Sequence, residues 1–133
     1  MIALGASAAG FDDESGMVTG SYQIIGRLPD SQKTYSGSAR VIQHGAELAI
    51  ERTIGGRMIR GSAHFERRTP DHIPFLVMRY EQDATRFEAQ CMLAGDLNNN
   101  ARLTCLTKRV DRPVREPGVE ALFMSTPLSG TPN

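Results

Sequence analysis

Cys91 and Cys105 are the two residues of this chain whose type and spacing point most directly to chemistry. Each lies in a run of alternating side chains, and a polar turn at 95–100 separates the two runs. A hairpin centred on Asn98 would place the cysteines opposite each other, close enough for a disulfide in the closer kind of strand pair. The alternative is a pair of buried free thiols. Two cysteines without a neighbouring histidine favour neither a metal site nor a cofactor.

The same hairpin register gathers apolar side chains on the face that carries the cysteines. Residues two apart along a strand share a face, so Phe87, Ala89 and Leu93 lie with Cys91. Leu103 then lies opposite Leu93, and Phe87 opposite the arginine at 109. If the fold encloses an open lumen, these apolar residues are expected to line it and to bind a small apolar ligand.

The remaining candidates for chemistry give weaker signals. His44, His64 and His72 lack the spacing of metal ligands, and no motif marks a nucleophile or a phosphate-binding loop. No catalytic residue is therefore assigned. Five arginines gather in one stretch and could bind a carboxylate or phosphate, but they are expected to form the solvated face of a hairpin, countered by acids across the strands. They are Arg52, Arg57, Arg60, Arg67 and Arg68.

Short runs of alternating or β-branched residues must position these side chains. Gly55-Gly56 predicts a tight hairpin turn, because both positions can adopt positive φ. The prolines of the 69–74 segment predict a loop, and no stretch has helical spacing. Eight runs are expected to be strands: 17–27, 34–43, 47–54, 57–67, 75–81, 85–94, 101–110 and 119–124.

This spacing predicts an all-β fold, an antiparallel up-and-down β-barrel of about eight strands, with a β-sandwich as the alternative. Sequential hairpins lose their exposed edges only when the sheet closes. The chain has 133 residues, enough for one domain, and we place the barrel at 17–124.

Glycine and turn positions resemble those of a known group of proteins. The pattern GSYQIIGRLPDSQKTYSGSARVIQHG, then TIGGRMIRGSAHF and REPGVEALF, resembles small bacterial exported proteins with a calycin-like eight-strand barrel. The resemblance implies architecture and carries over no catalytic residue. The chain has no Trp, so it lacks both the Gly-x-Trp of lipocalins and the tryptophan-lined biotin pocket of avidins. Tyr22 could take the place of the lipocalin Trp, which adds it to the candidate ligand-binding residues.

The two ends of the chain lack a strand pattern. Residues 1–16 are small and apolar and then acidic, and Ala6-Ser7-Ala8 fits a signal-peptide cleavage pattern, although a basic n-region is missing. We expect a flexible segment left from a signal peptide, and a periplasmic or secreted protein; a plain disordered terminus is the alternative. Residues 125–133 are expected to form a disordered tail.

The charge balance and hydropathy of the chain limit the classes of partner that it is expected to bind. Basic and acidic residues number 15 each, which argues against nucleic-acid binding, and no apolar run approaches the ~20 residues of a membrane helix. In 75–80 both faces are largely apolar, so this strand is expected to contact an outside partner, either the N-terminal segment, a second subunit of a homo-oligomer or another protein.

Three hypotheses for function remain open at this point. The first is an exported, non-enzymatic barrel that binds a small apolar or amphipathic ligand in its lumen. The second is a protein-protein interaction module, an inhibitor or an assembly subunit, whose barrel is filled by its own side chains. The third is a barrel enzyme. A filled interior would favour the second and would direct attention to 75–80 and the adjoining 70–74 loop.

Overall fold

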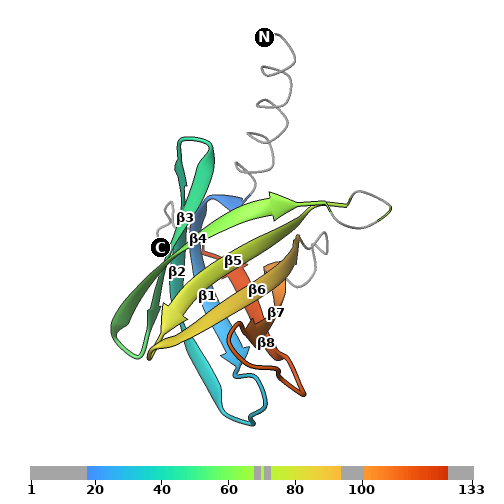
Figure 1. The fold of residues 1–133 in the computed structure, drawn as a ribbon. Coiled ribbons are helices and arrows are strands. Elements are labelled where there is room, and N and C mark those ends of the chain that lie inside the picture. Colours follow the sequence, from blue (N-terminus) through green and yellow to red (C-terminus); the bar gives the residue numbers. More distant parts are fainter. Residues whose placement is uncertain (1–17, 68–69, 71–72, 94–100, 126–133) are drawn as a thin grey trace.

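Eight antiparallel strands form a closed barrel in the computed structural model, which describes residues 18–67, 70, 73–93 and 101–125. Each strand pairs with the next, and the last pairs with the first, as Figure 1 shows. The predicted all-β, up-and-down barrel is therefore confirmed. The strands are β1 (Gly20–Arg27), β2 (Thr34–His44), β3 (Glu47–Ile54), β4 (Arg57–Glu66), β5 (Phe75–Gln82), β6 (Thr85–Leu93), β7 (Ala101–Arg109) and β8 (Gly118–Met124).

Seven of the eight strands begin and end within one residue of the predicted runs. The prediction was wrong for the start of the first run, because β1 begins at Gly20. Val18 is fully buried in the core cluster, and its carbonyl accepts a hydrogen bond from the Tyr22 hydroxyl. Val18 therefore packs into the barrel core and does not extend the ladder.

Two short turns lie at the end of the barrel where the chain passes from β1 to β2, which we call the turn end. Gly55 and Gly56 have φ of 60° and 79°, as the tight turn between β3 and β4 requires. Asp83 and Ala84 have φ of 53° and 63° in the corresponding turn between β5 and β6. The longer segments 28–33 and 110–117 lie at the same end, because the strands alternate in direction.

Side chains from all eight strands point inward and form a single core cluster. Their alternation with exposed residues follows the two-residue period of a strand. Three buried polar side chains lie among them, namely Arg52, Thr107 and Glu120. In the part of the chain that the structure describes, no helix has the length and apolarity needed to cross a membrane.

Several predictions concern residues outside the described ranges. They are the signal-peptide segment at 1–16, the tail from 126 onward, the turn at 95–100 and His72 of the proline-containing loop.

Candidate functional site

A disulfide joins Cys91 and Cys105, as the hairpin register predicts. The two residues are direct partners on β6 and β7, with their Cα atoms 3.9 Å apart. Leu93 pairs with Leu103 in the same ladder. Disulfides persist in oxidising environments, so this bond is compatible with an exported location.

The five residues predicted to bind a ligand all lie on the inward face of the barrel. Tyr22, Ala89 and Leu103 are at most 1% exposed, Phe87 is buried, and Leu93 packs against the core cluster. They belong to the core cluster or pack against it, and every strand contributes to that cluster. Their shared inward face agrees with the predicted register, and their binding of a ligand stays a prediction.

An ion pair lies inside the barrel between Arg52 of β3 and Glu120 of β8. Two nitrogens of the guanidinium each donate a hydrogen bond of 2.7 Å to one carboxylate oxygen, and both side chains are at most 1% exposed. Burial alone would lower the pKa of Arg52, but the hydrogen bonds and charge of Glu120 more than offset this and raise it. Arg52 therefore keeps its charge in the core.

Tyr35 completes the coordination of the carboxylate, because its hydroxyl donates a 2.5 Å hydrogen bond to Glu120. Gly26 lies between these two residues in the sheet, as the partner of both. A Cβ added at Gly26 would come within 2.5 Å of the Tyr35 ring. Only glycine at this position lets the ring cross β1 and reach the carboxylate.

The aromatic ring of Tyr80 covers the other side of the guanidinium. The guanidinium carbon of Arg52 lies 4.0 Å from the ring centroid, a cation-π contact. Tyr80 in turn stacks on Phe87, with ring centroids 5.5 Å apart. Glu120, Arg52, Tyr80 and Phe87 thus form a continuous chain of contacts inside the barrel.

The prediction that Arg52 lies on the solvated face of a hairpin was wrong, and Glu120 was not among the predicted site residues. The available signal was their phase along the strands. Arg52 is two residues from the buried Ile50, and Glu120 is two residues from the buried Leu122. Period-two counting would have placed both charges in the core, where each needs a partner of opposite sign.

Arg57, Arg60 and Arg67 are exposed, as predicted, and Arg68 lies outside the described residues. Glu51 pairs with Arg40 at 3.5 Å and with Arg60 at 3.9 Å across the β2–β4 sheet. His64 contacts Glu66 at 2.5 Å on the outer side of β4. Among the described residues, no group of three or more His, Cys, Asp or Glu side chains could hold a metal ion.

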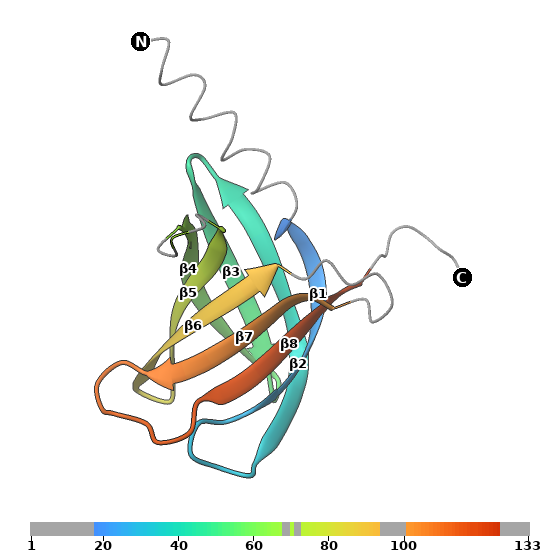
Figure 2. The ribbon, with the colours of Figure 1, turned by 90° about the vertical axis from the view of Figure 1, so that its right-hand side faces the viewer.

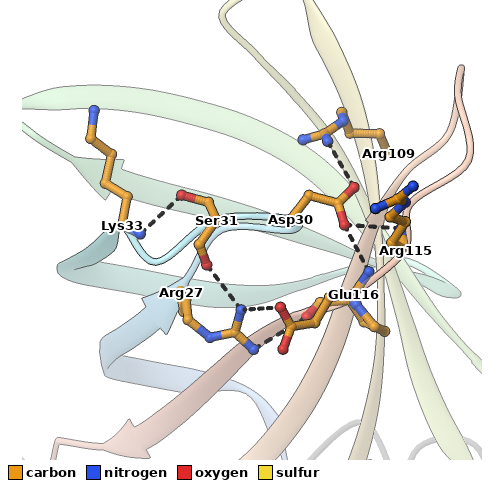
Figure 3. Close-up of polar contacts among 8 residues, drawn as sticks. Arg27, Asp30, Ser31, Lys33, Arg109, Arg115 and Glu116 are labelled. Carbon is orange, nitrogen blue, oxygen red and sulfur yellow. Dashed lines mark hydrogen bonds and ion pairs between the residues drawn. The ribbon is translucent and has the colours of Figure 1, made fainter.

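Asp30 fastens the 28–33 segment to the 110–117 segment at the turn end of the barrel (Figure 3). One carboxylate oxygen accepts hydrogen bonds of 2.9 and 2.7 Å from the backbone N–H groups of Arg115 and Glu116, and the other lies 3.4 Å from Arg109. Arg27 adds a hydrogen bond to the carbonyl of Ser31 and an ion pair with Glu116. These contacts hold the two loops together beside the mouth of the barrel.

An apolar groove of ≈ 520 Å³ lies on the outer surface of β6 and β7, at the start of β5. We call it the apolar groove. Met92 and Leu106 are 63% and 58% exposed on its floor, and Ile73 is 51% exposed. Its lining comprises Ile73, Pro74, Phe75, Met92, Leu106, Cys105 and two polar residues, Gln90 and Thr104.

The groove contains the first residue of the 75–80 strand, whose two faces the sequence analysis expected to be apolar. Phe75 pairs with Met92, and Met92 pairs with Thr104, so the groove crosses three strands on one outer row. Val77 lies on the same outward side of β5 and is fully buried without belonging to the interior core cluster. Large apolar side chains therefore lie on the outer face of the barrel wall as well as inside it.

The apolar groove could bind a ligand or partner through a matching shape and apolar contacts. Its volume is within the range of small-molecule sites, and Gln90 and Thr104 provide an amide and a hydroxyl among apolar side chains. Every strand has two neighbours, so no free edge is available for pairing with an added strand. A ligand or partner must therefore insert side chains or an apolar group.

Comparisons of the chain with protein-family models, with curated proteins and with solved structures found no match.

Proposed function

We propose that this protein is a non-enzymatic interaction module that binds an apolar segment of a protein in the apolar groove. The observation that carries the proposal is the contrast between the two sides of the barrel wall. Inside, the Arg52–Glu120 pair and the ring of Tyr80 lie in contact in the core, which supports a barrel filled by its own side chains. Outside, large apolar side chains are exposed around a hollow.

Exposed apolar side chains at a hollow are the usual mark of a binding surface on a small domain. The outer face of β2–β4 differs, because charged pairs such as Arg40–Glu51 cover it. In the groove, an aromatic or branched aliphatic side chain of the partner would displace water from Met92, Leu106 and Phe75. The amide of Gln90 would be available for a backbone group of the same segment.

The compartment proposed for this interaction is the periplasm or the exterior of the cell. The Cys91–Cys105 disulfide supports an oxidising environment. The likeness to exported calycin-like bacterial barrels is part of the same proposal and rests on the glycine and turn pattern alone. Binding of a small ligand in the lumen is the competing proposal. Variants in the groove and in the lumen distinguish it from binding in the groove.

The test is a titration with Nile red, a neutral apolar dye whose fluorescence rises in apolar surroundings. We expect saturable binding at a stoichiometry near one dye per chain. Met92→Glu should weaken it at least ~10-fold, because a charge in the groove must be desolvated. Met58→Glu is the matched control, since Met58 is a similarly exposed methionine, at 56%, outside the groove; it should leave binding unchanged.

A second variant tests the lumen. Ala89 is fully buried on the inward face, so Ala89→Trp would fill any internal cavity without touching the groove. Loss of dye binding in a folded Ala89→Trp variant, with Met92→Glu unaffected, would overturn the proposal in favour of a lumen ligand. Competition by a capped Ala-Phe-Ala tripeptide, and none by Ala-Ala-Ala, would show that the groove accepts a peptide side chain.

A further inference from the structure

Leu106 stands between two hollows on the outer face of β6, β7 and β8, the three strands that lie side by side in Figure 2. The apolar groove lies on one side of it. A smaller hollow of ≈ 190 Å³ lies on the other side, between Leu106 and Val114 of the 110–117 segment. An exposed apolar side chain and the hollows that could receive it therefore occur on the same face.

We infer that the apolar segment which this face binds belongs to a second copy of the chain, in a two-fold symmetric dimer. The inference rests on the proposed function of the groove. In a two-fold interface the same patch contacts itself, so a patch must carry both a projection and a matching hollow. Leu106 of one copy would enter the groove of the other, and the reverse contact follows by symmetry.

On β6, β7 and β8, the row that contains Leu106 and the next row away from the turn end carry no charged residue. Met92 pairs with Thr104, which pairs with Ala121, and Gln90 pairs with Leu106, which pairs with Val119. Val119 is 39% exposed and extends the apolar surface onto β8. Two such faces can approach each other without burying an unpaired charge.

The next row toward the turn end carries charges of both signs. Glu88 of β6 pairs in the ladder with Lys108 of β7, and Arg79 lies 3.6 Å from Glu88. A two-fold axis near Leu106 would bring this rim against the partner's surface with both signs available for pairing. The chain as a whole has a formal net charge of zero at pH 7, so two copies do not repel each other at long range.

The closed barrel also restricts how two copies can associate. Strand pairing between copies is unavailable, because all eight strands have both neighbours. Packing of one face on another is the remaining route, and an apolar centre with a charged rim is the anatomy of such an interface.

The test is sedimentation velocity of the full chain from about 1 to about 200 µM, a range that resolves micromolar association. We expect a reversible monomer–dimer equilibrium. Leu106→Glu should raise the dissociation constant at least ~100-fold, because the charge would be buried without a partner. Met58→Glu, on the other side of the barrel, should leave it unchanged. Far-ultraviolet circular dichroism would verify that each variant is folded.

The failure of this inference differs from the failure of the proposed function. A wild-type chain that stays monomeric at the highest concentration overturns the dimer, and so does a dimer that Leu106→Glu leaves intact. If such a monomer still binds Nile red in a manner sensitive to Met92→Glu, the groove remains a binding site for another partner. A monomer that binds no dye would overturn both. A true dimer should also bind less dye per chain as its concentration rises.

Discussion

At the scale of single residues, the barrel core contains a buried ion pair in which each charge needs the other as its partner. Removing both Arg52 and Glu120 from water is costly, and their two hydrogen bonds offset that cost only while both are present. The Tyr35 hydroxyl satisfies a further lone pair of the carboxylate, which Gly26 makes possible by leaving space for the ring. Buried Arg52 Nε has no hydrogen-bond partner among the described residues. The pair therefore adds little net stability, but it favours the one arrangement of strands that brings the two charges together.

We predict that Glu120→Gln destabilises the protein by about 3 to 5 kcal/mol, because the Arg52 charge then lies in the core without its counter-ion. Urea unfolding followed by far-ultraviolet circular dichroism measures the change. The double variant Arg52→Met with Glu120→Leu is the control, and it should be close to neutral, since both charges are gone. A loss below about 1 kcal/mol for Glu120→Gln would mean that water reaches the pair.

At the scale of strands, the disulfide joins β6 to β7 two positions from the last ladder pair, Leu93–Leu103. It joins residues that are already partners in the ladder and whose sequence separation is 14. Cys105 also lines the apolar groove, so the bond lies directly behind the groove floor. The hairpin that carries Met92 and Leu106 is thus closed by a covalent bond.

Reduction of this bond is predicted to lower the free energy of unfolding by about 3 kcal/mol, the value for a loop of about 15 residues. Denaturant unfolding with and without reductant gives the difference. The reductant should have no effect on a Cys91→Ala, Cys105→Ala double variant, which controls for effects elsewhere. Equal stability of the oxidised and reduced wild-type chains would show that strand pairing alone holds the hairpin.

At the scale of the whole molecule, burial controls how the protein responds to alkaline pH. Of the three tyrosines, Tyr22 and Tyr80 are buried and Tyr35 is partly buried, and burial is the main cause of the raised pKa of each. Burial raises the pKa of Tyr22 to about 12, and the charge and hydrogen bond of Glu120 raise the pKa of Tyr35 further. Tyr80 is raised despite the opposing charge of Arg52.

These shifts predict that stability falls as pH rises above 10. The unfolded chain loses its tyrosine protons near the ordinary pKa of 10.0, while the folded chain keeps them to a higher pH. The stabilising contribution is therefore complete below pH 10 and is lost as pH rises, by about 2 kcal/mol or more near pH 12. Ultraviolet absorbance of tyrosinate measures it: the native protein should titrate later than the protein in urea. A native titration centred near pH 10 would contradict the buried placement.

The sequence by itself predicted the strands and the opposition of Cys91 and Cys105, and it favoured a closed barrel over a sandwich. Alternation, Gly55-Gly56 and the turn spacing define hairpins through local chemistry, because side-chain period and backbone φ are properties of neighbouring residues. The opposition of Cys91 and Cys105 followed from counting residues around one turn. The inward placement of Phe87 and Leu103 followed from the same count.

Tertiary structure decided which residues fill the barrel and what lies outside it. Arg52 and Glu120 are 68 residues apart, and only the pairing of β8 with β1 brings Glu120 within reach of β3 and of Tyr35. Likewise, Ile73 and Leu106 line one groove because three strands lie side by side. Such contacts depend on barrel closure, which arranges distant strands in space, and no local pattern along the chain encodes their distances.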